Sequence, residues 1–172
     1  MEADIVFRKL ISTDLDNLLN YLHSLSIETK SRFGPHPFDR DSVISFYNCE
    51  DVVGYVAIDT ATNSLSAYTI IKKGILQHDK ERLLNYNYPG IETNCCTFAP
   101  SVADNFQSKG IGTKLFDYIL SDIHSWGVNK IILWGGVQAT NEKAVNFYRK
   151  KGFKPLGLFE YNGTNIDMLL EI

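Results

Sequence analysis

The fold of this chain is decided by the segment VADNFQSKGIGTKL, residues 102–115, which follows a predicted strand and opens a long predicted helix. Gly110 and Gly112 carry no side chain, so the backbone around them can approach an anion closely. The helix that begins here directs the positive end of its dipole toward the same place, which is worth about 0.3–1 kcal/mol to a bound anion. The segment therefore predicts a phosphate site, although glycines in such a turn can also serve only to bend the chain.

Two other phosphate-binding motifs do not fit this segment. The Rossmann pattern needs a third glycine where Leu115 stands, and the P-loop needs Gly-Lys-Ser/Thr where this chain has Gly112-Thr113-Lys114. A nucleotide-binding α/β domain of either type is therefore disfavoured.

Hydrophobic periodicity on both sides of the segment predicts strands and helices in a mixed order. Alternating, β-branched runs predict strands over residues 4–10, 51–60, 65–73, 92–102, 130–137, 153–161 and 166–172. Helical spacing predicts helices capped by Ser12 or Thr13, over residues 41–47, from Gly110 to Gly127, and from Thr140 to Gly152, with one or two turns within residues 77–87. Pro100 predicts a bulge or an unpaired edge near the end of its strand. The order gives a mixed α/β fold, with a central sheet of about six to seven strands flanked by helices.

A second motif, NEKAVNFYRKKGF, occupies residues 141–153, about thirty residues after the first. It resembles the second signature of the GNAT superfamily of N-acyltransferases, Asn-x-x-Ala-x-x-Phe/Leu-Tyr-x-x-x-Gly-Phe. Residues 102–115 resemble the acyl-CoA signature of that superfamily, Gln/Arg-x-x-Gly-x-Gly/Ala behind a strand. The strand around residues 53–55 and the terminal strand pair also stand where the superfamily has them. The resemblance covers nearly the whole chain and implies a single GNAT acetyltransferase domain over residues 1–172.

The resemblance also implies which residues hold acetyl-CoA. The backbone near Val102 would pair with the pantetheine arm, residues 107–113 would hold the pyrophosphate, and Asn141 would bond the cofactor arm. Capping of the helix beside Thr140 is the alternative role for Asn141, and the two roles are compatible. The full set that the resemblance assigns to the cofactor is Val102, Gln107, Ser108, Lys109, Gly110, Ile111, Gly112, Thr113, Asn141, Ala144, Phe147 and Tyr148.

Tyr148 occupies, by the same resemblance, the position of the general acid that protonates the departing CoA thiolate. Many relatives carry a glutamate in the fourth strand as a base acting through water, but Thr97 stands at the aligned position. An amine of pKa about 10.4 is only about one part in a few thousand neutral at pH 7, so some group must take its proton. Glu92, at the head of the same predicted strand, is the substitute, with an ordinary surface carboxylate as its alternative role.

Composition limits the remaining classes. The chain has 172 residues and a formal net charge of −3, which argues against nucleic acid as a partner. Basic residues nevertheless gather near the two motifs: Lys109, Lys114, Lys143, Arg149, Lys150 and Lys151. Cys49, Cys95 and Cys96 suit neither a disulfide framework nor a zinc site, and the histidines show no close pair at metal-ligand spacing, so we expect no metal. His36 is expected in a solvent-facing loop, although it could line the acceptor side.

These observations together predict a cytoplasmic enzyme, monomeric or homodimeric, with no signal peptide and no membrane span. The resemblance to the GNAT superfamily implies an N-acetyltransferase that moves the acetyl group of acetyl-CoA to a primary amine by direct attack in a ternary complex. A non-catalytic acyl-CoA-binding sensor or regulatory module is the alternative, because intact cofactor signatures do not require catalysis. The acceptor is unidentified; residues 26–34 loosely resemble the loop that several bacterial branches place over the acceptor pocket.

Overall fold

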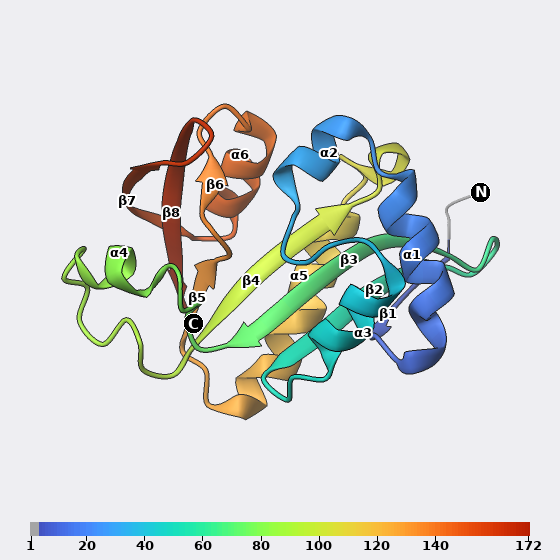
Figure 1. Ribbon diagram of the computed structural model, residues 1–172, viewed down its shortest axis with the longest axis horizontal. Coiled ribbons are helices and arrows are strands. Elements are labelled where there is room, and N and C mark those ends of the chain that lie inside the picture. The colour runs from blue at the N-terminus through green and yellow to red at the C-terminus, as the bar shows by residue number, and fades with distance from the viewer. Residues whose placement is uncertain (1–3) are drawn as a thin grey trace. The chain divides into compact units, whose positions relative to one another are not determined.

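The computed structural model describes residues 4–172, so the first three residues of the N-terminal segment considered above lie outside it. Its strands are β1 (Ile5–Lys9), β2 (Val52–Asp59), β3 (Ser64–Lys73), β4 (Cys95–Val102), β5 (Lys130–Leu133), β6 (Val137–Gln138), β7 (Lys154–Glu160) and β8 (Thr164–Glu171) (Figure 1). Its helices are α1 (Leu15–Ser24), α2 (Ile27–Arg32), α3 (Arg40–Tyr47), α4 (Lys80–Leu84), α5 (Ile111–Ile123) and α6 (Glu142–Lys150). Single 3-10 turns cover Ser12–Asp14, Asp104–Phe106 and His124–Trp126. Within residues 4–172, no helix combines the length and the apolar character needed to cross a bilayer.

Hydrogen bonds join the strands in the order β1-β2-β3-β4-β5-β8-β6, and β7 pairs with β8. β4 runs parallel to β5, whereas β5 runs antiparallel to β8. The predicted mixed α/β fold is confirmed. Within residues 4–172, the sheet has eight strands rather than six to seven. One added strand has a local cause, because Gly135 and Gly136 both adopt a positive φ and split the single strand expected over residues 130–137 into β5 and β6.

The chain forms two compact units. The first runs to Ile71 and resumes over Ala99–Ile123; the second comprises Lys72–Phe98 and His124–Ile172. The first two boundaries fall inside strands, in β3 and in β4, and the third falls at the end of α5. The single domain expected over residues 1–172 stays a prediction.

In the first unit, α5 provides an apolar face that contacts β1 and β2. Its buried residues recur at helical spacing, which is the pattern that predicted the helix: Ile111, Leu115, Phe116, Ile119 and Ile123. A polar contact accompanies this face, because the Tyr55 hydroxyl of β2 donates to the Asp122 carboxylate at 2.6 Å.

The start of α1 differs from the prediction, because neither Ser12 nor Thr13 caps it. Asp14 fixes this turn instead: its buried carboxylate accepts two hydrogen bonds from Arg8, both at 2.7 Å, and one from the backbone N–H of Ile11 at 2.9 Å. The Arg8 hydrogen bonds hold the pKa of Asp14 below its usual range. A partner from the neighbouring strand has thus replaced a local serine or threonine cap.

In the second unit, the segment between β3 and β4 packs on the sheet through α4. Its apolar cluster joins Leu83 and Ile91 from that segment to three strand residues, Cys95, Ile132 and Leu169. β4 starts at Cys95 rather than at Glu92, because Asn94 adopts a positive φ of 51° that an extended strand cannot continue through. The pairing of β4 with β5 ends at Phe98, while β4 itself continues to Val102. The bulge or unpaired edge expected near Pro100 stays a prediction.

A buried carboxylate lies beside this cluster. Asp167 of β8 is fully buried and accepts hydrogen bonds from Arg82, at 2.7 and 3.2 Å, and from the Tyr86 hydroxyl at 2.8 Å. The Arg82 guanidinium also lies 3.7 Å from the ring centre of Phe159, over its face. The segment that carries α4 is therefore fixed to β7 and β8 by charge as well as by apolar contact.

Candidate functional site

The glycine loop, residues 102–113, begins at the end of β4 and passes through one 3-10 turn before α5 starts at Ile111. Ser108 and Gly110 both adopt a positive φ, 61° and 80°. A Cβ built on Gly110 would meet no described atom within 4 Å, so the loop backbone faces open space there. The first intrahelical bond runs from the Lys114 N–H to the Gly110 carbonyl, and the N–H groups before it have no acceptor within the helix. The loop therefore presents backbone donors and a helix dipole to an anion.

The remaining loop residues differ in exposure. Ser108, Lys109 and Thr113 are exposed, Gly112 is half-buried, and Ile111 is buried at the start of α5. The Lys109 ammonium lies 5.5 Å from the ring centre of Phe106, so a cation stands beside the loop backbone.

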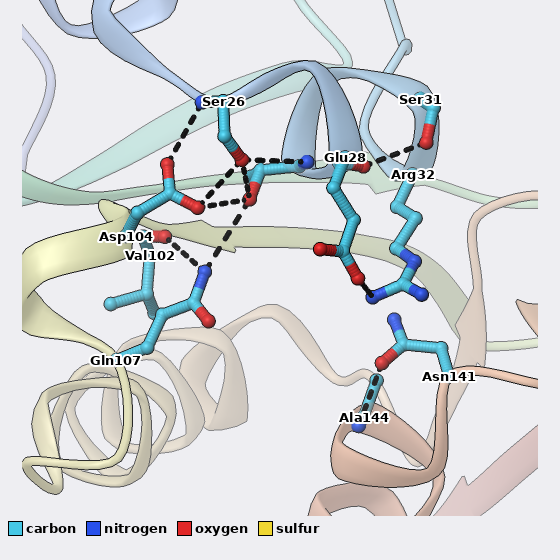
Figure 2. A network of polar contacts seen from close by, with 10 residues as sticks. Ser26, Glu28, Ser31, Arg32, Val102, Asp104, Gln107, Asn141 and Ala144 are labelled. Carbon is cyan, nitrogen blue, oxygen red and sulfur yellow. Dashed lines mark hydrogen bonds and ion pairs between the residues drawn. The ribbon is translucent and has the colours of Figure 1, made fainter.

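Gln107 does not point its amide away from the loop. Its Nε2 donates to the Val102 carbonyl at 3.2 Å and lies 3.4 Å from the Thr29 hydroxyl oxygen (Figure 2). Its predicted pyrophosphate contact stays a prediction. In this geometry the Gln107 side chain stabilises the loop by a hydrogen bond to the carbonyl of Val102, the last residue of β4.

Asp104 is a polar residue of this loop that the sequence reasoning did not single out. Its carboxylate accepts hydrogen bonds from the Ser26 N–H at 2.9 Å, the Ser26 hydroxyl at 2.8 Å and the Thr29 hydroxyl at 2.7 Å (Figure 2). The Ser26 backbone bond is the main cause of a lowered pKa at Asp104. These bonds tie Ser26 and Thr29, from the segment 26–34 that loosely resembles an acceptor-side loop, to the glycine loop.

The second motif forms α6 in the other unit. Asn141, rather than Thr140, caps this helix: its side-chain oxygen accepts from the Ala144 N–H at 3.3 Å, and its own carbonyl accepts from the Val145 N–H at 3.0 Å. The structure thus assigns the capping role to Asn141. Its side-chain nitrogen carries two further donors, so a contact with a cofactor arm remains compatible with the cap.

Tyr148 lies on the buried side of α6, where 7% of its surface is exposed. Three rings surround it, with centroids at 6.3 Å for Phe98, 5.4 Å for Phe147 and 5.4 Å for Phe153. Burial raises its pKa above the usual value of a phenol, and within the described residues no hydrogen bond contributes to that shift. Tyr148 therefore keeps its proton through the physiological pH range. Ala144 and Phe147, also assigned to the cofactor, are half-buried on the same helix.

The two base positions considered above have different surroundings. Thr97 is buried and its hydroxyl donates to the Gly74 carbonyl at 2.8 Å, so it supports the chain between β3 and β4. Glu92 lies three residues before β4, with 44% of its side chain exposed, and pairs with Lys80 at 2.7 Å. Its role as the base stays a prediction.

The buried thiols behave as packed side chains. Burial raises the pKa of Cys95, and raises that of Cys96 to about 12, so neither forms a thiolate readily. Among residues 4–172, no group of three or more His, Cys, Asp or Glu side chains is placed to hold a metal ion.

His36 is buried, so the solvent-facing loop position expected for it is wrong. Its Nδ1 lies 2.7 Å from the Pro37 carbonyl and its Nε2 lies 3.0 Å from the Tyr68 hydroxyl. Because a carbonyl only accepts, we assign the proton to Nδ1 and let Nε2 accept from Tyr68. The hydroxyl of Tyr68 lies 2.5 Å from that of Tyr47, which extends the chain of polar contacts. His36 also lines a shallow surface pocket of about 510 Å³, together with Pro35, Pro37 and four residues of α3 that include Phe46.

Comparison with known proteins identifies the family. The family described as "Acetyltransferase (GNAT) family" matches residues 19–153. No curated protein matches the chain. Among solved structures, the chain is similar to an N-acetyltransferase from Staphylococcus aureus Mu50, with 16% identity, a TM-score of 0.74, and coverage of 98% of this chain and 99% of that one.

Two further structures have the same fold. The GNAT domain of S. lividans PAT is 17% identical, with a TM-score of 0.73 and coverage of 96% of this chain and 89% of that one. The ribosomal-protein-S5-alanine acetyltransferase from Vibrio fischeri is 13% identical, with a TM-score of 0.74 and coverage of 97% and 92%. At these identities the structures establish the fold, and the family match covers more than half of the chain; the chain therefore belongs to the GNAT acetyltransferase family and is an acyltransferase.

Proposed function

We propose that this chain transfers the acetyl group of acetyl-CoA to a primary amine by direct attack in a ternary complex. The observation that carries the proposal is the glycine loop. Ser108 and Gly110 hold a left-handed backbone beside open space, directly before the thirteen-residue helix α5. Within this family, that arrangement is suited to the pyrophosphate of the co-substrate.

The residues present fit acetyl-CoA on chemical grounds. A pyrophosphate needs several donors and no nearby bulk, and the first turn of α5 supplies N–H groups next to a glycine. Lys109 adds an exposed cation beside them. In the second unit, we propose that the Asn141 amide, Ala144 and Phe147 contact the cofactor arm, while backbone groups near Val102 pair with pantetheine.

Tyr148 is the proposed general acid. Acetyl-CoA supplies a thioester, whose acyl carbon accepts the amine lone pair while the C–S bond breaks. Tyr148 would then give its phenolic proton to the sulfur. At ordinary pKa values of about 10 and about 8.5, this transfer runs uphill by about 2 kcal/mol. Burial raises the pKa of Tyr148 further, so the transfer requires that the departing sulfur is buried too, because burial also raises the pKa of a thiol, as it does for Cys96.

Removal of the amine proton is a separate requirement. Keeping an amine of pKa about 10.4 neutral at pH 7 costs about 4.6 kcal/mol, so a base or a chain of water must take this proton. We propose Glu92 for this role, because its carboxylate is accessible to water. Glu92 belongs to the segment between β3 and β4, and Thr97 lies on the strand that follows this segment. Glu92→Gln removes the base while leaving a side chain of the same size. If turnover drops at pH 7 and recovers at higher pH, where more of the amine is neutral, the result supports Glu92 as the base. Unchanged turnover shows that water takes the amine proton instead.

The acceptor is proposed only as a primary amine. The Vibrio fischeri relative is named for the alanine of a ribosomal protein, which offers an α-amine. Amine acceptors of different size should therefore be tested together, including peptides with a free N-terminus, lysine side chains, polyamines and amino sugars.

The experiment has two stages. CoA or acetyl-CoA at a hundredfold excess over its dissociation constant should stabilise the folded chain by about 2.7 kcal/mol, which thermal unfolding detects. Release of free thiol from acetyl-CoA then screens the amines. No shift of the melting temperature at millimolar CoA would refute the cofactor assignment. A shift without thiol release from any amine would instead refute the transferase step.

A further inference from the structure

We propose that Asp104 is a positioning residue that couples α2 to the glycine loop, so that binding of the co-substrate orders the acceptor-side segment. The proposal rests on the proposed function, in which the glycine loop holds acetyl-CoA. It concerns contacts within the first unit only: Asp104 and α2 both belong to it.

The first step is the weakness of α2 as a packed element. It spans six residues, Ile27–Arg32, and none of them is buried. Ile27, its one large apolar side chain, is 88% exposed. A helix this short is marginal without tertiary contacts. Burial holds only its flanks, at Leu25 before it and Phe33 after it. The helix between these two anchors must therefore be placed by polar contacts.

The second step is the identity of those polar contacts. Ser26 is the N-cap, and its hydroxyl accepts from the Thr29 N–H at 3.2 Å. The same hydroxyl donates to Asp104, which also accepts from the Ser26 N–H and the Thr29 hydroxyl (Figure 2). One carboxylate thus receives three hydrogen bonds from the first turn of α2, and bonds to a charged acceptor are about twice as strong as neutral ones. Lys30 adds a bond to the His23 carbonyl at 2.7 Å, but that contact leads back to α1.

The third step is the position of Asp104 in the chain. It opens the 3-10 turn within the glycine loop, three residues before Gln107 and six before Gly110. Gln107 reinforces the link, since its Nε2 lies close to both the Thr29 hydroxyl and the Val102 carbonyl. A ligand that holds the glycine loop in one conformation therefore also holds the Asp104 carboxylate in the position where it accepts hydrogen bonds from Ser26 and Thr29. By linkage, whatever fixes α2 must favour the loop conformation that binds the co-substrate to the same degree.

The test measures hydrogen exchange of the amides in residues 26–32, in the full chain, with and without CoA. In the wild type, CoA should slow this exchange by about fivefold or more, the low end of the usual range for coupled sites. The Asp104→Asn variant should still bind CoA but lose most of this protection. The double variant Ser26→Ala with Thr29→Val removes the hydroxyl donors from the α2 side, outside the glycine loop, and should give the same loss.

Asp39→Asn is the matched control, because Asp39 caps α3 in the same unit by accepting from the Ser42 N–H, whereas the carboxylate of Asp104 accepts from Ser26 and Thr29. It should keep the full CoA-dependent protection of α2. The coupling is overturned if CoA still slows the exchange of residues 26–32 in both the Asp104 variant and the double variant. It is also overturned if bound CoA does not slow this exchange in the wild type. A wild type that binds no CoA overturns the proposed function instead, so the two failures are distinguishable.

Discussion

Replacing Tyr148 by phenylalanine separates the catalytic role of the hydroxyl from the packing role of the ring. The ring stays in its cage of Phe98, Phe147 and Phe153, with the centroid distances of 5.4–6.3 Å unchanged in kind. Within the described residues, no hydrogen bond contributes to the shifted pKa of Tyr148, so its hydroxyl leaves no unpaired partner when it is removed. We therefore expect a stability change below about 1 kcal/mol, because only losing a partner leaves a buried group unsatisfied. For a chain of this size, that corresponds to about 2–4 °C in Tm.

Turnover should respond much more strongly. A single acid–base group contributes about 10²–10⁴ to the rate, equivalent to about 2.7–5.5 kcal/mol in the barrier. Burial of Tyr148 supports this range, since a residue only 7% exposed leaves little room for water to supply the proton in its place. Its raised pKa adds a pH prediction: the acid must be protonated to act, so the wild-type rate should show no alkaline loss from this group below about pH 10.

The assay is thiol release at saturating acetyl-CoA, with denaturant unfolding and CoA affinity measured on the same preparation. Tyr161→Phe is the matched control, because Tyr161 lies in the same unit with 72% of its surface exposed and should lose nothing. Turnover of Tyr148→Phe within about twofold of the wild type, at normal CoA affinity, removes Tyr148 from the mechanism. A large loss of stability with normal turnover per folded molecule would show that the residue only packs.

Three further perturbations test other parts of the argument. Gly112→Asp places a carboxylate where the anion should lie, so calorimetry should show CoA binding at least about tenfold weaker, while folding is retained because an acidic residue suits the first turn of a helix. Burial lowers the pKa of His36, so the unfolded chain takes up its proton first; stability present above about pH 6.5 is lost as the pH falls below it, and His36→Gln should flatten this part of the denaturant-unfolding profile. Asp167→Ala removes the buried carboxylate that accepts from Arg82 and Tyr86, while Arg82 keeps its ion pair with Asp79 at 2.8 Å, so it should cost about 1–3 kcal/mol in unfolding free energy. Glu92→Gln at the exposed pair with Lys80 should cost less than about 1 kcal/mol.

Sequence patterns predicted the elements that are defined by local residues. α5 begins at Ile111 because an apolar face at helical spacing follows the glycine loop. The β7–β8 hairpin turns at Asn162 and Gly163, both with positive φ, which are the residue types that tolerate that conformation. Such signals need no information from the rest of the chain.

Elements fixed by distant partners could not be predicted in this way. α2 has no apolar periodicity, and its tie to Asp104 spans more than seventy residues of sequence. His36 is buried because β3 brings Tyr68 to it, and nothing next to His36 in the sequence shows that. Asp167 likewise meets Arg82 and Tyr86 across more than eighty residues. The choice between Thr140 and Asn141 as the cap of α6 is also decided by the path of the chain, since both residue types are good caps.

The segment between β3 and β4 explains why position 97 holds a threonine. Strand side chains alternate, so Thr97 shares a face of β4 with Cys95, and Cys95 packs with Leu83 and Ile91 of that segment. A carboxylate on this buried face would lose its hydration among apolar neighbours, whereas the threonine hydroxyl satisfies the Gly74 carbonyl at 2.8 Å. The segment that makes a charged base unfavourable at position 97 also carries Glu92, three residues before β4, with 44% of its side chain exposed. A protein base in this part of the chain is therefore expected in the segment between β3 and β4, at Glu92, and not at position 97 of β4.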